Sequence, residues 1–265
     1  MKFRPCVDIH NGKVKQIVGG SLRDEGGFAK DNFVSDLDGA YYGELYKSRG
    51  LSGGHIIILN PVGSEYYEAD CEQARLALSA YPQGFQLGGG INDQNAESFL
   101  EMGASQVIVT SFVFKDGQLN EENLGKMVSA VGKDRLVLDL SCRKRDGRYY
   151  IVTDRWQKFT DVEVNEQTIK QLQGFCAELL IHGVDSEGRQ SGIERELVSL
   201  MARCCEIPAT YAGGISEMEE IDEIERLGLG KIDFTVGSAL DIFGGKLSFE
   251  TICRTFCKSY RGRPF

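Results

Sequence analysis

The amino-acid sequence lacks several features that mark particular classes of protein, and each absence excludes something. It has no apolar run that approaches the ~18 residues of a membrane-spanning helix, so we expect no membrane partner. Its 30 Lys and Arg are outnumbered by 39 Asp and Glu, and a net charge of −9 argues against nucleic-acid binding. Its eight cysteines are scattered without zinc-ligand spacing, which predicts buried thiols in a reducing compartment and no metal site.

The sequence also has no linker, no low-complexity tract and no recognisable targeting segment. Met1–Gly12 does not have the pattern of a signal peptide, and no Arg- and Ser-rich extension of the transit-peptide type is present. We therefore expect a cytoplasmic protein with one domain over residues 1–265, ending in a loose tail at 259–265. A monomer is the working expectation for its assembly.

Short β-type runs alternate with helical patterns along the whole chain. This alternation indicates repeated βα units around a parallel sheet. The expected strands are Phe3–Ile9, His55–Asn60, Gly84–Leu87, Gln106–Thr110, Arg135–Leu140, Glu178–His182, Ala209–Tyr211 and Lys231–Val236. Eight such units in 265 residues fit a (β/α)8 barrel better than an open sheet, and such barrels carry their active sites at the carboxyl ends of the strands.

A glycine-rich segment occurs twice in matching surroundings. Leu87–Ile91 is matched by Ala212–Ile215, 124 residues later counting from Gly89 to Gly213, and each copy stands between a β-type run and a helical pattern. Glycine allows close backbone approach and helix-start amides favour anions, so two phosphate sites are predicted; ordinary strand–helix turns are the alternative. The residues assigned to phosphate binding are Gly89, Gly90, Thr110 and Ser111 in one copy, and Gly213, Gly214, Gly237 and Ser238 in the other. The barrel is accordingly expected to consist of two half-barrels, residues 1–131 and 132–258.

Two aspartates repeat with nearly the same offset as the glycines. Asp8 and Asp139 are 131 residues apart, and each closes an apolar strand at its carboxyl end. A single carboxylate there could cap a loop, but the paired placement favours acid–base catalysis, because different surroundings push two carboxyl pKa values apart. No Ser/His/Asp or Cys/His arrangement is evident, so we expect no covalent nucleophile, and the glycine pattern is not a dinucleotide fingerprint.

The opening segment Arg4–Gln16, both Gly-Gly-Ile loops, the Val236–Ala239 run and Asp139 together resemble the histidine-biosynthesis barrels. The resemblance is to the eukaryotic isomerases of phosphoribosylformimino-5-aminoimidazole carboxamide ribotide, and it spans roughly residues 3 to 258. It implies an Amadori-type aldose-to-ketose rearrangement of a small bisphosphorylated substrate without a cofactor. On this interpretation Asp8 abstracts the C2′ proton as general base and Asp139 protonates the ribose ring oxygen as general acid, or the two roles are exchanged.

The resemblance also implies three substrate-binding side chains. Trp156 lies in the loop after the fifth strand, where these isomerases have a tryptophan that can stack on an imidazole base; a packing role is the equal alternative. After the sixth strand, His182 and Glu187 stand where bacterial relatives usually have threonine and aspartate, and we assign both to substrate contact. A structural role is the equal alternative for His182, and a share in the acid role is the alternative for Glu187. The polar, glycine-bearing segment Gly19–Asn32 is expected to form a lid in the first βα loop.

Two other functions are compatible with parts of the pattern. The sister family is the cyclase subunit of imidazole glycerol phosphate synthase, which has the same aspartate pair and a lysine soon after its first strand; Lys13 or Lys15 could imitate that lysine. A barrel that binds phosphates without catalysis is the third possibility, although such a binder gains nothing from two carboxylates beside its anion sites.

Overall fold

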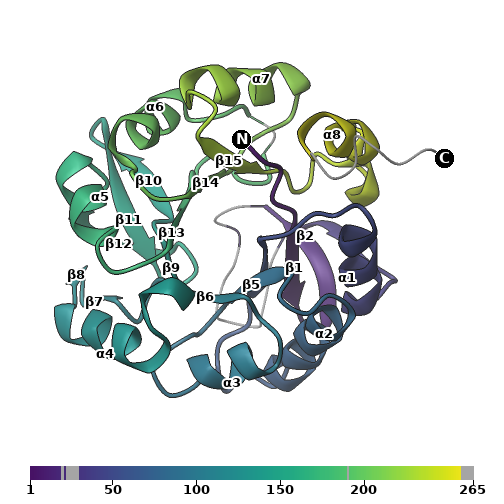
Figure 1. Cartoon of the computed structure of the whole chain (residues 1–265), viewed down its shortest axis with the longest axis horizontal. Helices are drawn as coiled ribbons and strands as arrows, with labels where there is room; N and C mark the ends of the chain where they lie inside the picture. Colours follow the sequence, from purple (N-terminus) through teal and green to yellow (C-terminus); the bar gives the residue numbers. More distant parts are fainter. Residues whose placement is uncertain (19–20, 22–29, 190, 258–265) are drawn as a thin grey trace.

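The computed structural model describes residues 1–18, 21, 30–189 and 191–257, and within these ranges eight parallel strands form a closed ring surrounded by helices (Figure 1). Each strand of the ring pairs with the next, in the order β15-β14-β13-β9-β6-β5-β4-β1. The ring closes where Phe3 forms a parallel bridge with Phe234, whose carbonyl oxygen accepts from the Arg4 amide at 2.8 Å. The predicted (β/α)8 barrel is therefore confirmed.

The ring strands agree with the predicted ones to within three residues at every end. They are β1 (Cys6–His10), β4 (Gly54–Ile58), β5 (Phe85–Gly88), β6 (Gln106–Val109), β9 (Leu136–Asp139), β13 (Glu178–His182), β14 (Ala209–Ala212) and β15 (Ile232–Thr235). The surrounding helices are α1 (Gly39–Ser48), α2 (Tyr67–Ala80), α3 (Ala96–Glu101), α4 (Glu121–Val131), α5 (Glu166–Leu172), α6 (Arg195–Cys204), α7 (Met218–Leu227) and α8 (Phe249–Phe256), with short 3₁₀ turns at Lys133–Arg135 and Asp241–Phe243. Side-chain oxygens of Asp38, Asn120, Asn165 and Ser248 accept a backbone N–H at the starts of α1, α4, α5 and α8, which fixes where these helices begin.

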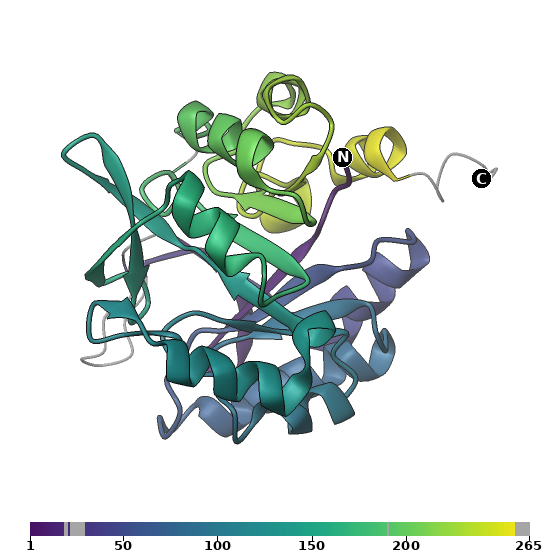
Figure 2. The ribbon, with the colours of Figure 1, turned by 60° about the vertical axis from the view of Figure 1, so that its left-hand side comes forward.

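Antiparallel additions extend the barrel beyond the carboxyl ends of its strands. They are β2 (Lys13–Ile17) and β3 (Asp31–Val34) after β1, β7 (Phe114–Lys115) and β8 (Gln118–Leu119) after β6, and β10 (Cys142–Arg145), β11 (Arg148–Thr153) and β12 (Lys158–Glu163) after β9. Figure 2 shows the teal sheet β10–β12 projecting past one end of the barrel. These additions build walls around that end only.

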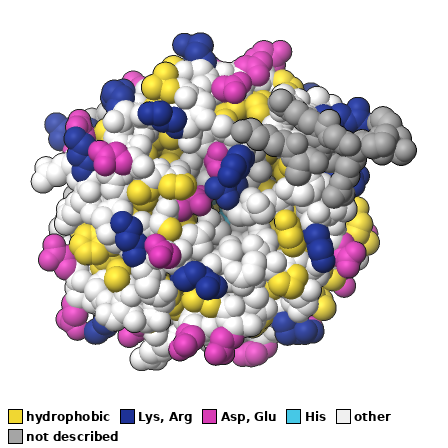
Figure 3. Space-filling model, viewed as in Figure 1, with side chains coloured by type: hydrophobic (Ala, Val, Ile, Leu, Met, Phe, Trp, Pro, Cys, Tyr) yellow, Lys and Arg dark blue, Asp and Glu magenta, His cyan; other side chains and the backbone are white. Residues whose placement is uncertain are grey.

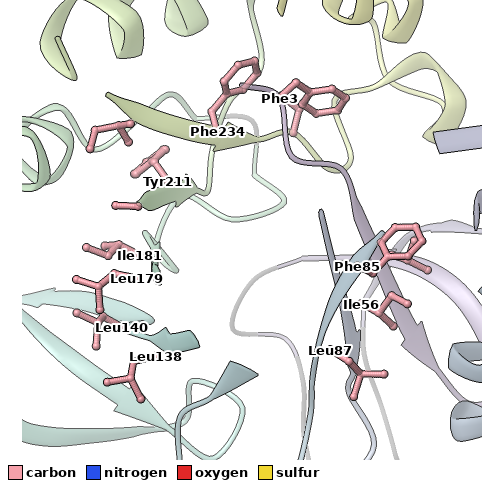
Figure 4. Close-up of a cluster of buried hydrophobic side chains, with 14 of the residues drawn as sticks. Phe3, Ile56, Phe85, Leu87, Leu138, Leu140, Leu179, Ile181, Tyr211 and Phe234 are labelled. Atoms are coloured by element: carbon pink, nitrogen blue, oxygen red, sulfur yellow. The ribbon is translucent and has the colours of Figure 1, made fainter. Parts of the chain in front are cut away.

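The main apolar core lies between the ring and the helices. Outward-facing side chains such as Ile56, Phe85, Leu138, Ile181 and Phe234 are all at most 3% exposed (Figure 4). Each buried side chain of this size contributes about 1.5–3 kcal/mol to folding, so the ring is held mainly from outside. Inside the ring lies a smaller apolar cluster, formed by Ile108, Val137, Leu180 and Ala212.

A buried polar cluster fills the amino-terminal end of the ring. Glu178 accepts hydrogen bonds from Gln86 Nε2 at 2.9 Å and from Thr210 Oγ1 at 2.7 Å, while Arg4 Nε donates to Asp233 Oδ2 at 2.8 Å. Figure 3 views the molecule from this end and shows acidic and basic side chains close to the centre of the ring. The polar groups at this end of the ring are therefore satisfied by one another, whereas the cavity lies at the carboxyl ends of the strands.

Candidate active site

A cavity of about 310 Å³ lies at the carboxyl ends of the ring strands. The structure brings every residue that we assigned to the site from the sequence into its lining: Asp8, Gly89, Gly90, Thr110, Ser111, Asp139, Trp156, His182, Glu187, Gly213, Gly214, Gly237 and Ser238. These residues come from seven of the ring strands and from the segments that follow them. Such convergence is what the topology of a parallel barrel requires of strand-end residues.

The two glycine-rich loops have matching backbone conformations. Gly89 and Gly90 have φ values of +110° and +69°, and Gly213 and Gly214 have +119° and +76°. A Cβ on Gly89 would collide with the carbonyl oxygen of Ile58 at the end of β4, and a Cβ on Gly213 would collide with the backbone of Gly183 after β13. Both loops therefore need glycine for conformation and for space, and both present bare backbone to the cavity.

Asp8 is half-buried in the middle of β1, with one side-chain donor beside it. Gln16 Nε2 donates to Asp8 Oδ2 at 3.3 Å. Burial, followed by the nearby negative charge of Glu187, raises the pKa of Asp8 to about 7, and His182 opposes the rise. A carboxyl group with a pKa near neutrality can take up and release a proton under physiological conditions.

Asp139 ends β9 and has a different set of partners. Its carboxylate accepts hydrogen bonds from Thr110 Oγ1 at 3.0 Å and from Ser141 Oγ at 2.9 Å. Burial raises the pKa of Asp139 above its usual value, whereas His182 and the two hydroxyl donors act in the opposite direction. The two aspartates thus sit in distinct environments, as a division of acid and base roles requires.

His182 and Glu187 form a hydrogen-bonded pair beside the aspartates. His182 Nε2 lies 2.9 Å from Glu187 Oε2, at the end of β13 and in the loop that follows. Burial alone would lower the pKa of His182, but Glu187, Asp139 and Asp8 together raise it above its ordinary value. These three carboxyl groups therefore favour the charged form of the imidazole.

Trp156 reaches the cavity from the turn between β11 and β12. Asp154, Arg155 and Trp156 have φ values of +50°, +55° and +66°, three consecutive residues in the left-handed region. Such strain persists only where contacts enforce it, and here Trp156 Nε1 donates to Ser141 Oγ at 3.1 Å. The Trp156 ring also packs against Ile17 and Leu59.

The two lysines that could have imitated the cyclase lysine point elsewhere. Lys13 is exposed, and Lys15 Nζ pairs with Asp31 Oδ2 at 3.0 Å; neither lysine lines the cavity. Most of the segment predicted to be a lid, Gly19–Asn32, lies outside the described residues. Of its described part, Asn32 Nδ2 donates to the Gly188 carbonyl oxygen at 2.9 Å, next to Glu187.

Two contacts at the aspartates were not anticipated from the sequence. Ser141 links Asp139 to the Trp156 indole, and its position two residues after Asp139 would have been a usable signal. Gln16 contacts Asp8 because β2 pairs antiparallel with β1. No local sequence pattern predicts that contact. Each of these two residues donates a hydrogen bond to one of the aspartates from the segment that follows that aspartate's strand.

The described residues include neither a metal site nor a membrane-spanning helix. Within them, no group of three or more His, Cys, Asp or Glu side chains is arranged to hold a metal ion. No helix in the described ranges is long and apolar enough to cross a membrane.

Comparison with known proteins gives consistent matches over nearly the whole chain. The family model described as "Histidine biosynthesis protein" matches residues 2–248. A Medicago truncatula protein named 1-(5-phosphoribosyl)-5-((5-phosphoribosylamino)methylideneamino)imidazole-4-carboxamide isomerase, chloroplastic, is 51% identical over 256 residues, 95% of this chain and 80% of that protein. Isomerases of the same name from Neurospora crassa and Saccharomyces cerevisiae are 45% and 43% identical, over 92% and 96% of this chain and 94% and 97% of the relatives.

Proposed function

The chain belongs to the histidine biosynthesis protein family as an isomerase of the aminoimidazole carboxamide ribotide, and we propose that Asp8 and Asp139 carry out its chemistry. The observation that carries this proposal is the placement of the two aspartates. Both line one cavity together with two matched glycine-rich loops. A substrate with a phosphate at each end would then present its reacting ribose to the carboxyl groups.

In the proposed reaction one aspartate donates a proton to the substrate and the other removes one from it. Asp139, whose pKa is raised by burial, protonates the ribose ring oxygen, and the bond from that oxygen to C1′ breaks as the lone pair of the substituent nitrogen forms a double bond to C1′, which gives an open-chain protonated imine. Asp8 removes the proton from C2′, and the electron pair forms an enaminol between C1′ and C2′. Return of a proton to C1′ and loss of the C2′ hydroxyl proton give the ketose. Substrate and product are isomers, so no cofactor is consumed.

The phosphate loops contribute mainly orientation in this proposal. Backbone amides of Gly89, Gly90, Gly213 and Gly214 would bind the two phosphates, with Thr110, Ser111, Gly237 and Ser238 beside them. Fixing both ends of an elongated molecule holds C2′ near the base and supplies a large share of the rate enhancement. Each half-barrel, 1–131 and 132–258, would thus provide one aspartate and one phosphate loop.

Trp156, His182 and Glu187 are proposed to bind the remainder of the substrate. The Trp156 indole can stack on the imidazole base, and the His182–Glu187 pair continues the same wall of the cavity. The isomerase rather than the cyclase is favoured by Trp156 in the cavity lining and by the absence of Lys13 and Lys15 from it.

Paired substitutions test the aspartate roles. Asp8→Asn and Asp139→Asn should each abolish turnover while substrate affinity stays within about tenfold, because both phosphate loops are unchanged. Asp36→Asn, which removes an exposed carboxyl group, is the matched control and should behave as wild type. Substantial residual turnover in either site variant would remove that aspartate from the mechanism.

We propose that the protein acts as a monomer in the cytoplasm. One chain supplies both aspartates and both glycine-rich loops of the cavity, which supports a monomer as the active unit; light scattering at assay concentration tests this. None of the eight cysteines, all of which lie in the described ranges, forms a disulfide, as in a reducing compartment, and we propose the cytoplasm. The Medicago truncatula relative is named chloroplastic, so a fluorescent fusion found in plastids would overturn this location.

A further inference from the structure

Gln16 is a buried amide that faces the base and is assigned no role by the family resemblance. It lies on β2, 1% exposed, paired across the hairpin with Phe33 of β3. Its Nε2 atom lies 3.3 Å from Asp8 Oδ2 and 3.7 Å from Cys6 Sγ, so the donor end of the amide is turned towards β1. No other side chain among the described residues donates a hydrogen bond to the Asp8 carboxylate.

The other end of the Gln16 amide abuts the second phosphate loop. A Cβ built on Gly237 would collide with Gln16 Oε1, which is the nearest atom to it. Gly237 does not have a positive φ, so its backbone conformation would accept a side chain. The absence of a side chain at position 237 is therefore explained by the space that the Gln16 amide occupies. One side chain thus touches both the base and the loop beside Ser238.

We propose that Gln16 is a positioning residue that holds the Asp8 carboxylate in its working orientation against the second phosphate loop. The inference rests on the proposed base role of Asp8. An N–H donor favours the ionised form of the carboxylate that accepts from it, which is the form that abstracts a proton. Because the same amide packs against Gly237, the distance from bound phosphate to base is set by one rigid, buried side chain.

The alternative is that Gln16 merely fills space and satisfies the Cys6 thiol. If Gln16 only fills space, its substitution would change the temperature of unfolding but not the pKa of Asp8. Gln16→Met keeps the length and most of the volume of the side chain and removes both amide groups. Loss of the donor would raise the pKa of Asp8, so the acidic limb of the pH profile would move to higher pH.

The experiment is to record kcat and KM from pH 5 to 9 for the wild type, Gln16→Met and Gly237→Ala. For Gln16→Met we expect kcat at neutral pH to fall about tenfold, KM to stay within about threefold, and the acidic limb of kcat to rise by about one pH unit. Gly237→Ala displaces the amide from the opposite side and should move the limb in the same direction, which keeps the test valid if Gln16→Met does not fold.

Gln86→Met is the matched control, because Gln86 is an equally buried amide in the same barrel, bonded to Glu178 at the amino-terminal end of the ring. It should lower Tm and leave the acidic limb unchanged. An unmoved limb in both Gln16→Met and Gly237→Ala, with kcat falling only as the folded fraction falls, would overturn the inference. Turnover that survives Asp8→Asn would instead overturn the base assignment, so the two failures are distinguishable.

Discussion

The indole of Trp156 meets the imidazole of His182 edge to face, with ring centroids 5.0 Å apart and planes at 87°. The contact joins the turn between β11 and β12 to the end of β13, two segments that the barrel topology alone does not bring together. Because Glu187 holds the same imidazole at 2.9 Å, the three side chains form one continuous wall of the cavity. Several consequences of this wall and of the aspartates can be measured.

Substituting Trp156 tests whether the indole binds substrate or only packs. Stacking of a base on an aromatic ring is worth about 1–3 kcal/mol, so Trp156→Ala should raise KM about tenfold or more, and Trp156→Phe should recover most of the loss. Steady-state kinetics with thermal denaturation of both variants provide the measurement. A fall in Tm with unchanged KM would assign Trp156 to packing.

The pH dependence of kcat/KM reports the protonation of the free base. With the pKa of Asp8 at about 7, the carboxylate is protonated at low pH and cannot abstract a proton. The rate should therefore fall about tenfold per unit below pH 7. Substrate phosphate also titrates in this range, so the affinity of Asp8→Asn for substrate serves as a control over the same pH values. A profile that is flat from pH 5 to 8 would contradict the assignment.

Asp8→Asn should stabilise the folded protein even as it removes turnover. The unfolded carboxyl ionises near 3.8 and the folded one near 7, so ionisation at higher pH costs folding free energy. The variant should gain roughly 1–3 kcal/mol in free energy of unfolding at pH 8, and the gain should disappear below about pH 4, where both states are protonated. Urea denaturation at the two pH values measures this. Equal destabilisation at both would show that Asp8 is structural.

Gly90→Ala tests the first phosphate loop. Gly90 has φ +69°, and a Cβ there would press on a terminal carbon of Val62 at the cavity wall. KM should rise at least tenfold, because both backbone strain and the added methyl disturb the amides that face the phosphate.

Gly147→Ala is the control for that substitution. Gly147 has φ +79° with open space around it, at the turn between β10 and β11. It should show similar destabilisation with an unchanged KM. If Gly90→Ala also leaves KM unchanged, the loop does not bind phosphate.

The ring strands and the residues at their ends could be predicted because a short, local sequence pattern marks each of them. An apolar run followed by glycine or aspartate predicts a strand and what lies at its carboxyl end, and parallel pairing then brings those ends together. This is why Asp8 and Asp139, far apart in the chain, were both expected in one cavity, and both line it. Duplication strengthened the prediction, since two weak glycine signals in matched surroundings support each other.

The antiparallel additions were not predictable for a physical reason. Strands β3, β10 and β12 are partly exposed, so their apolar pattern is weak. Their contacts with the site, through Trp156 and Gln16, depend on tertiary packing rather than on local sequence. The left-handed run at Asp154–Trp156 has no glycine to signal it.

The measurement that tests the central claim most directly is an absorbance assay of the purified chain with the aldose ribotide, without ammonia or a partner protein. If the chain is the isomerase and Asp8 is its base, the wild type converts the aldose to the ketose and Asp8→Asn does not. No conversion of the aldose, with consumption of supplied ketose only after ammonia is added, would contradict it.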